Sequence, residues 1–410
     1  MRLEPLPARE YAAYRREAIF AACKWDPQIG DVNVLADHAL VLEPETAAWL
    51  EAQAECLAAE IAALEEALLS RPELFGELGL GGRLGRALRG AGGSCPSGVR
   101  LMRFDFHPLG PLGPLVPSGP LAGGWAVSEV NSDVPGGFGE AGVLPRLAAS
   151  LLSGTSPAGP DPARAVAKAF AGRLAGHGRV ALVHATAYSD DRQVMEYLAA
   201  AMREEGLDPI LLAPDHLRLD DGRARSVAWG QEGEVHALFR FFPAEWLPNL
   251  SGDWRGFFHD GPPACNHAAA LLCQSKRAPL VWPRLGVPFP AWRSLLPATE
   301  DPRRVDWEHD PSWILKPALG RVGEDVAVPE VLEPGEWKRI RSSARRHPRA
   351  WVAQRRFDSL PVETRAGERH VCVGVYTVDG KAAGFYARVA ERPRIDQYAQ
   401  DAPVLVRRIG

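Results

Sequence analysis

The chain has 410 residues, of which 46% are hydrophobic and 24% are charged, and its formal net charge is -4. This composition is that of a globular protein, so it excludes the disordered and collagen-like classes. It also excludes a polybasic surface for nucleic acid at the level of the whole chain. The length allows two or three subdomains.

The cysteines and the N-terminus indicate a cytoplasmic enzyme. No CxxC pair and no zinc spacing occurs, and scattered cysteines favour reduced thiols. Residues 1–7 lack the apolar core of a signal peptide, and no apolar run is long enough to span a bilayer. We therefore expect no membrane and no nucleic acid among the partners. The six cysteines are Cys23, Cys56, Cys95, Cys265, Cys273 and Cys372.

Residues 43–70 are predicted to form one long packing helix, because leucines recur there at spacings of three, four and seven. Residues 76–98 are rich in Gly and Arg but lack the GxxxxGK[ST] pattern, so a mobile surface loop is expected. Residues 99–106 and 125–131 alternate apolar and polar side chains, as half-buried strands do. They are expected to form a hairpin with a long insertion, residues 107–124.

Residues 155–165, rich in Pro, Ala, Gly and Asp, are expected to form a linker between subdomains. A β-α-β pattern follows, with a strand at 180–183, a helix from 191 to about 205 and a strand at 209–212. The pattern predicts a small Rossmann-like layer. Because it carries no GxGxxG, we do not expect it to bind a dinucleotide.

The last segment, from about 263 to 410, is expected to mix helices and strands. Asp379-Gly380 predicts a tight hairpin turn, because this dipeptide supplies the backbone conformations that such a turn needs. The strands of this segment are predicted near residues 313–316, 351–354, 371–378 and 382–388.

Charged and amide side chains gather on the first two predicted strands. Arg103 and Asp105 are two residues apart, as are Glu129 and Asn131, so each pair shares one face of its strand. Carboxylate and amide oxygens on adjacent strands suit Mg²⁺, which also binds phosphate oxygens. A surface ion-pair ladder has the same composition, and the residues alone leave both interpretations open.

Two lysines stand out in the last third of the chain. Lys316 ends a predicted strand and precedes a loop with Gly320 and Gly323. Such a loop can lay backbone N–H groups over phosphates while the lysine adds positive charge. A hairpin with an exposed lysine is an equally good interpretation. Lys276 precedes an apolar stretch and by itself indicates little.

Taken together and in this order, these segments resemble the glutathionylspermidine synthase family, a circularly permuted ATP-grasp family. Residues 103–106 are similar to its Arg-Phe-Asp strand, and residues 128–133 to its Tyr-Glu-x-Asn-Ala-Asp element. Residues 315–323 are similar to its Lys-Pro-x-x-Gly-Arg-x-Gly loop. The resemblance spans roughly residues 100 to 390. Further similar segments are residues 140–142, 240–246, 275–282 and 383–388.

The resemblance implies a role for each matching residue. It implies that Asp105, Glu129 and Asn131 hold Mg²⁺, and that Arg103 and Arg388 face the transferred phosphoryl group and act in catalysis. His267 competes with Lys276 for the lysine position beside the phosphates, because Asn266-His267 also aligns there. The ATP-binding residues that the resemblance implies are Lys276, Lys316, Gly320, Arg321, Gly323 and Gln354, the last of them beside the adenine.

The resemblance implies an ATP- and Mg²⁺-dependent ligase that joins a small-molecule or peptide carboxylate to an amine through an acyl phosphate. Positive groups and a metal around the phosphates suit this phosphoryl transfer, and a glycine loop that closes would keep water out. Residues 134–137 lack the small hydroxyl residues that the resemblance places against glutathione. We therefore expect a carboxylate substrate other than glutathione.

The expected fold is α+β, a circularly permuted ATP-grasp with an inserted Rossmann-like, pre-ATP-grasp layer. Residues 1–160 are expected to hold an N-terminal helical region and the metal-site strands. Residues 161–262 are expected to form the Rossmann-like layer, and residues 263–410 the nucleotide-binding lid and C-terminal strands. Two other functions stay open: an ATP-grasp-like scaffold without turnover, and an ATP-dependent kinase or a ligase with a non-amine nucleophile.

Overall fold

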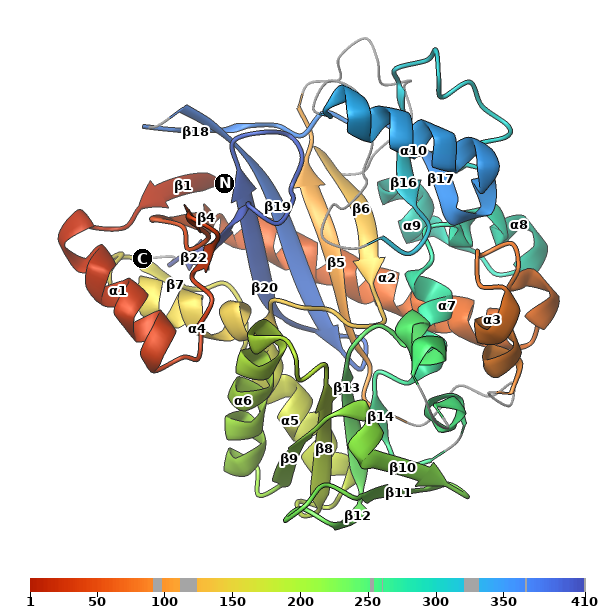
Figure 1. The fold of residues 1–410 in the computed structure, drawn as a ribbon. Helices are drawn as coiled ribbons and strands as arrows, with labels where there is room; N and C mark the ends of the chain where they lie inside the picture. The colour runs from red at the N-terminus through yellow and green to blue at the C-terminus, as the bar shows by residue number, and fades with distance from the viewer. Residues whose placement is uncertain are drawn as a thin grey trace.

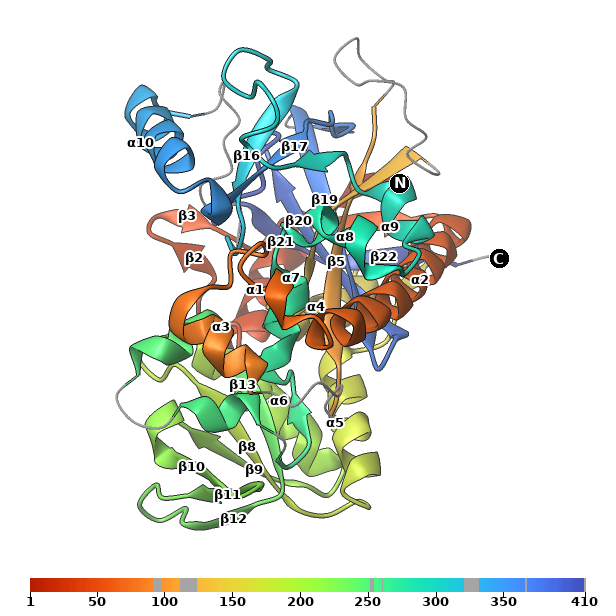
Figure 2. The ribbon, with the colours of Figure 1, turned by 90° about the vertical axis from the view of Figure 1, so that its right-hand side faces the viewer.

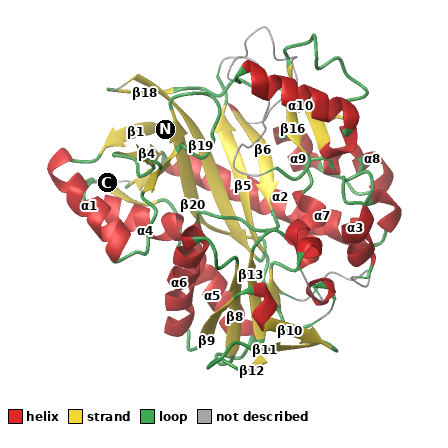
Figure 3. Ribbon diagram, viewed as in Figure 1, coloured by secondary structure: helices red, strands yellow, loops and turns green. Residues whose placement is uncertain are grey.

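The computed structural model describes residues 1–90, 98–110, 124–250, 254–259, 261–320, 332–365 and 367–408. Helices and strands alternate along the chain and gather into several sheets (Figure 3). This mixture confirms the α+β class. Within the described ranges, no helix is long and apolar enough to cross a membrane.

The largest sheet is antiparallel and has the order β21-β20-β19-β5-β6. The hairpin predicted for residues 99–106 and 125–131 is confirmed as β5 and β6, with Asp105 opposite Glu129. Residues 111–123 of the hairpin insertion lie outside the described residues. The turn at Asp379-Gly380 is also confirmed, since both residues have positive φ. The strands are β5 (Leu101–Pro108), β6 (Trp125–Asn131), β19 (Gly367–Val378), β20 (Lys381–Ala390), β21 (Gln400–Ala402) and the short β18 (Val362–Thr364), which pairs with β19.

Helix α2 (Pro44–Leu69) covers one face of this sheet (Figures 1 and 2). Its leucines share one core with Phe104 and Phe106 of β5 and with the valines of β19, which confirms the predicted packing helix. Because successive strand residues point to opposite faces, Arg103 and Asp105 project away from α2. One face of the sheet is therefore apolar and covered, and the other carries polar side chains.

A parallel sheet of order β14-β13-β8-β9 forms a second layer, at the bottom of Figure 1. The predicted β-α-β run at its centre is confirmed. The strand order changes direction between β8 and β13, and such sheets bind ligands outside the carboxyl ends of their strands at that point. The elements are α5 (Pro162–Arg173), β8 (Arg179–His184), α6 (Ser189–Glu204), β9 (Asp208–Leu212), β13 (Ala237–Phe241) and β14 (Ala264–Cys265), with an antiparallel extension of β10 (Leu217–Asp220), β11 (Arg223–Ser226) and β12 (Gly233–Val235).

A third sheet has the order β15-β17-β16 and carries helix α10 (Pro334–Arg346). Its strands are β15 (Thr299–Glu300), β16 (Trp313–Pro317) and β17 (Trp351–Arg355), which confirms the two strands predicted in this part of the chain. Ile340 and Ala344 of α10 share a small core with Trp313 and Trp351. Figure 1 shows this sheet beside β6, at the upper right.

A small sheet of order β1-β4-β22-β7 joins the two ends of the chain. The linker expected at residues 155–165 is wrong, because the first three residues form β7 and pair with β22. Asp161 caps α5, accepting a hydrogen bond from Ala163 N at 2.9 Å. The Pro and Asp that suggested a linker are thus start signals of a helix. The elements are β1 (Arg2–Pro5), α1 (Ala8–Phe20), β4 (His38–Leu42), α4 (Phe138–Ala149), β7 (Thr155–Pro157) and β22 (Val404–Arg407).

The surface loop expected at residues 76–98 is also partly wrong. Residues Gly82–Arg89 form helix α3, which buries Ala87 and Leu88 in the main core. Packing here overrides the low helix propensity of the glycines, and residues 91–97 lie outside the described residues. The domain boundaries expected at 160 and 262 stay a prediction. The remaining short elements are β2 (Gln28–Ile29), β3 (Val32–Asn33), α7 (Leu271–Gln274), α8 (Trp282–Leu285) and α9 (Pro290–Leu295).

Candidate active site

Strand alternation gathers polar side chains on the face of the main sheet that α2 leaves free. The register pairs Asp105 with both Glu129 and Gly374, so the row continues across the sheet. Lys276 and Lys316 reach this face from outside the sheet. We call it the polar face. Its strand residues are Arg103, Asp105, His107, Glu129, Asn131, Cys372, Gly374, Tyr376, Tyr386, Arg388 and Asp401.

Arg103 and Asp105 form a two-pronged ion pair at the centre of the polar face. Nε and Nη2 of Arg103 lie 2.7 and 2.9 Å from the two carboxylate oxygens. Asn131 Nδ2 donates to the same carboxylate at 2.9 Å. Arg103 lies across Gly374, where a Cβ would come within 2.7 Å of Arg103 Cδ. Only glycine leaves room for the guanidinium at that position.

Lys276 and Glu129 form a second ion pair beside the first. Lys276 Nζ lies 2.7 Å from Glu129 Oε2 and donates to the carbonyl oxygen of Gly320 at 2.6 Å. Burial acts to raise the pKa of Glu129, but the charges of Lys276, Lys316 and Arg103 outweigh it and the pKa falls below its usual value. Glu129 is therefore ionised at neutral pH.

Lys316 is buried, so the interpretation as an exposed hairpin lysine is wrong. Its side chain descends from the end of β16 onto β6, where Nζ lies 3.4 Å from Ser128 O. Burial lowers the pKa of Lys316 to about 8; the Glu129 carboxylate opposes this change and the Lys276 ammonium adds to it. The ammonium is therefore costly to bury, because the Glu129 carboxylate offsets only part of the effect of burial and of Lys276.

Arg388 lies at one edge of the polar face. Its Nη2 donates to the carbonyl oxygens of Asp396 at 2.8 Å and Ala399 at 2.9 Å, and its Nε lies 3.9 Å from Asp401 Oδ1. Tyr386 donates from its hydroxyl to the same oxygen at 2.5 Å. The guanidinium is thus held by the C-terminal segment.

A pocket opens beside Glu129 and Lys276, between α2 and the third sheet. It holds about 420 Å³, including the part that is open to solvent. Gln354 of β17 donates from Nε2 to Thr299 Oγ1 at 3.0 Å, whereas its buried Oε1 has no partner among the described residues. An apolar pocket with a few convergent polar groups is typical of a small-molecule site. Its apolar walls include Ile61, Leu64, Trp282, Trp292 and Leu296.

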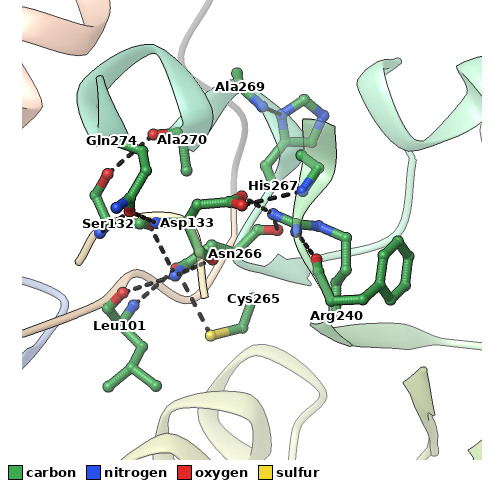
Figure 4. A network of polar contacts seen from close by, with 12 residues as sticks. Leu101, Ser132, Asp133, Arg240, Cys265, Asn266, His267, Ala269, Ala270 and Gln274 are labelled. Carbon is green, nitrogen blue, oxygen red and sulfur yellow. Dashed lines mark hydrogen bonds and ion pairs between the residues drawn. The ribbon is translucent and has the colours of Figure 1, made fainter. Parts of the chain in front are cut away.

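Figure 4 shows the junction between the parallel layer and the main sheet. Arg240 of β13 pairs with the fully buried Asp133, which also accepts a hydrogen bond from Ala244 N at 3.0 Å. Asn266 exchanges two hydrogen bonds with the backbone of Leu101, at 2.7 and 2.9 Å. Asp133 therefore belongs to the junction, although it continues the spacing of the candidate metal ligands.

Two of the predicted ATP-binding residues cannot be placed, and the two candidates for the phosphate lysine can be compared. Arg321 and Gly323 lie outside the described residues. Between the two candidates for the phosphate lysine, Lys276 is the one beside Glu129. His267 instead caps a short helix, where its Nδ1 accepts from Ala269 N at 3.2 Å.

The sequence analysis missed several members of the polar face. His107 continues the spacing of Arg103 and Asp105; burial and the Lys316 charge lower its pKa to about 3, so its imidazole is neutral. Its Nε2 lies 3.0 Å from Ser128 Oγ. Extending the period of two along each matching strand would have found these residues. The other members missed in this way are Cys372, Tyr376 and Tyr386.

Gly137, which precedes α4, supports one prediction on the stability of the site. Its φ is +82°, and a Cβ there would lie 2.8 Å from the ring of Tyr386. We expect Gly137→Ala to lower the free energy of unfolding by about 1–3 kcal/mol, measured by urea denaturation. Gly136→Ala is the control, because a Cβ there meets nothing within 4 Å. Equal stability of the two variants would contradict the prediction.

Comparison with known proteins gives the chain a family. The sequence model of glutathionylspermidine synthase preATP-grasp matches residues 122–407, more than half of the chain. A solved glutathione synthetase-like effector from Globodera pallida, in its apo form, has a TM-score of 0.59 at 11% identity over 96% of each chain, which shows a similar fold. A candidate gamma-glutamylcysteine synthetase from Methylobacillus flagellatus KT has a TM-score of 0.45 at 13% identity, over 82% of this chain and 88% of that one. No curated protein sequence matches significantly. The chain belongs to the glutathionylspermidine synthase preATP-grasp family.

Proposed function

We propose that the protein is an ATP- and Mg²⁺-dependent carboxylate–amine ligase that forms an amide bond through an acyl phosphate. The family and the synthetase-like fold support the ligase class. One observation carries the proposal: the buried Lys316 and the largely buried Lys276 both lie close to Glu129, which lines an apolar pocket. Concentrated positive charge in a buried site is what phosphoryl transfer requires.

We assign the pocket to the adenine of ATP. The indole walls from Trp282 and Trp292 suit a flat aromatic ring, and Gln354 Oε1, which has no partner among the described residues, suits its exocyclic amino group. Lys276 and Lys316 would then contact the phosphates. Gly320, whose carbonyl already accepts from Lys276, begins the loop that we assign to cover them. Arg321 and Gly323 of that loop lie outside the described residues.

Asp105, Glu129 and Asn131 fit Mg²⁺ by their chemistry. They offer two carboxylates and one amide on paired strands, with Asp105 opposite Glu129. In the described part of the chain no three His, Cys, Asp or Glu side chains gather as a complete metal cage. Mg²⁺ usually takes one or two carboxylates and completes its shell with phosphate and water. When bound, it would neutralise charge on the phosphates.

The reaction would then proceed in two steps, in which residues of the chain hold the charged groups in place. In the first, an oxygen of the substrate carboxylate attacks the γ-phosphorus and ADP leaves, while Lys276 and Lys316 hold the phosphate charge. In the second, the amine nitrogen attacks the acyl carbon, the bond to phosphate breaks, and the proton that the nitrogen loses passes to the departing phosphate or to water. Arg103 and Arg388 would face the acyl phosphate oxygens. Neither step needs a protein nucleophile, and Cys372 stays a thiol because burial raises its pKa.

We propose that the carboxylate substrate is not glutathione. The stretch before α4 offers Gly136 and Gly137 where hydroxyl side chains would be needed. The Gly136 carbonyl already accepts from Arg103 Nη1 at 2.7 Å and from the Tyr376 hydroxyl. Gly137 has no room for a side chain against Tyr386.

Calorimetric titration with ATP, with and without Mg²⁺, tests the proposal. We expect micromolar binding that requires Mg²⁺, followed by ADP release that depends on both a carboxylate and an amine. ADP release without any amine would favour the kinase or non-amine ligase. Binding without turnover on any substrate pair would favour the scaffold, and no binding at all would refute the nucleotide site.

The metal assignment predicts the effect of Glu129→Gln. The substitution keeps the side-chain shape but removes a charge that lies next to Lys276. We expect the Mg²⁺ concentration for half-maximal ATP binding to rise about tenfold or more. Glu55→Gln, which breaks an ion pair with Lys381 at 3.1 Å, is the control and should leave it unchanged. The same Mg²⁺ dependence in all three proteins would exclude Glu129 as a ligand.

A further inference from the structure

Lys24 is a buried cation that none of the sequence motifs includes. It lies between α1 and β2, before the residues that the family model matches, and is 7% exposed. Its Nζ lies 2.7 Å from Glu140 Oε1, 3.2 Å from Asp26 Oδ1 and 3.2 Å from Asp401 Oδ2. Three carboxylates thus surround one ammonium at the edge of the polar face.

We propose that Lys24 is a positioning residue for the candidate active site: it fixes Asp401, and through Asp401 it fixes Tyr386 and Arg103. The effect on turnover rests on the proposed ligase function, whereas the effect on the geometry of Arg103 does not. The N-terminal segment, outside the matched family region, thereby completes the site.

Asp401 connects Lys24 to Tyr386. The two carboxylate oxygens of Asp401 have different partners. Oδ2 lies 3.2 Å from Lys24 Nζ, and Oδ1 accepts a hydrogen bond from the Tyr386 hydroxyl at 2.5 Å. Asp401 N also donates to Val34 O at 2.7 Å, so its backbone is held by the same N-terminal segment. The orientation of the Tyr386 ring therefore depends on a carboxylate that Lys24 balances.

A second contact runs from Tyr386 to the ion pair at the centre of the polar face. The guanidinium carbon of Arg103 lies 5.2 Å from the centroid of the Tyr386 ring, a distance typical of a cation–π contact. Gly137 also packs closely against the ring, since a Cβ there would lie 2.8 Å from Tyr386 Cζ. Arg103 in turn holds both oxygens of Asp105. A rotation of Tyr386 would shift Arg103 and with it a candidate Mg²⁺ ligand.

The charge balance explains why a lysine is needed here. Burial alone would lower the pKa of Lys24, but Glu140, Asp401 and Asp26 outweigh it and raise the pKa well above its usual value. Even with Lys24 present, the buried Oε2 of Glu140 has no hydrogen-bond partner among the described residues. Without the ammonium, Asp401 and Glu140 would repel each other and one of them would turn away.

The geometric part of the proposal is tested by NMR of the arginine Nε–H groups in ¹⁵N-labelled protein. Arg103→Lys assigns the Arg103 signal, and Arg277, whose Nε donates to Glu77 O at 2.5 Å, serves as internal reference. We expect Lys24→Met to move or broaden the Arg103 signal while the Arg277 signal stays. Lys381→Met removes an exposed lysine with its ion pair and should move neither. An unchanged Arg103 signal in Lys24→Met overturns the proposal.

The catalytic part is tested by ATP turnover of the same variants. We expect kcat to fall about tenfold or more in Lys24→Met with little change in the KM for ATP, and to recover in Lys24→Arg. A lower melting temperature with unchanged kcat would reduce Lys24 to a structural role and overturn the proposal. If Lys24→Met does not fold, both tests use Lys24→Met/Glu140→Gln, which removes the charge of the Glu140 carboxylate together with the ammonium. If the wild-type protein neither binds nor hydrolyses ATP, the proposed function fails. The NMR result still decides whether Lys24 fixes the position of Arg103.

Discussion

Lys316→Ala is expected to weaken Mg²⁺-dependent ATP binding by roughly a hundredfold, because hydrogen bonds to charged groups contribute about 1.5–3 kcal/mol and here act in a buried site. Lys316 is buried, and its Nζ lies 3.4 Å from Ser128 O, close to Glu129. Among the described residues no carboxylate pairs with its ammonium alone, since Glu129 pairs with Lys276 at 2.7 Å. A polyphosphate would supply the missing counter-charge.

The same burial predicts that Lys316 does not stabilise the fold. The fall of its pKa from 10.5 to about 8 corresponds to a cost on the order of 3 kcal/mol for keeping the ammonium in the folded state. Because the folded-state pKa lies below the unfolded one, this cost is fully present below pH 8 and disappears as the pH rises towards 10.5. Lys316→Met keeps the stem without the charge, so at pH 7 it should unfold at no lower a temperature than wild type.

ATP affinity should therefore depend on pH. Only the protonated form of Lys316 attracts phosphate, so its contribution to the affinity should be complete well below pH 8 and be lost as the pH rises above it. Lys316→Arg stays charged throughout this range and should abolish the dependence. Lys338→Ala, on α10, removes a lysine outside the site and serves as control. If Lys316→Ala binds ATP with the affinity of the wild-type protein, Lys316 does not contact the nucleotide.

The sequence predicted those site residues whose positions follow from the alternation of side chains along a strand. The period of two puts Arg103 and Asp105 on one face of their strand and Glu129 and Asn131 on one face of theirs. The register then sets the two pairs opposite each other. The hairpin, the long helix and the β-α-β run were found for the same reason, since each depends on neighbours within one segment.

The part that could not be predicted depends on contacts between distant segments. Lys316 was expected to be exposed as readily as to bind phosphate, because nothing in its own strand shows that β16 ends against β6. Lys24 meets Asp401, which is 377 positions later in the chain, and no local pattern connects them. The error at residues 155–165 had a different origin, since the same Pro and Asp can mark a linker or a helix start.

The largest loss of stability is expected at the junction in Figure 4, on substitution of Asp133 by asparagine. Asp133 and Arg240 are 0% and 3% exposed, and they pair with each other. An arginine stays charged at any pH that a folded protein tolerates, so Arg240 would remain in the core as a cation without its anion. Breaking a buried pair in this way costs about 3–5 kcal/mol. The free energy of urea denaturation measures this loss directly.

A double-substitution cycle separates the charge effect from a general disturbance of the junction. Asp133→Asn/Arg240→Met removes both charges, so it should be more stable than Asp133→Asn alone, since no unpaired ion is left in the core. Asp208→Asn, which breaks an exposed pair with Arg179 at 2.9 Å, should cost no more than about 1 kcal/mol. If Asp133→Asn costs no more than this control, Arg240 must find another anion. The parallel layer would then be held to the main sheet by the hydrogen bonds of Asn266 rather than by the ion pair.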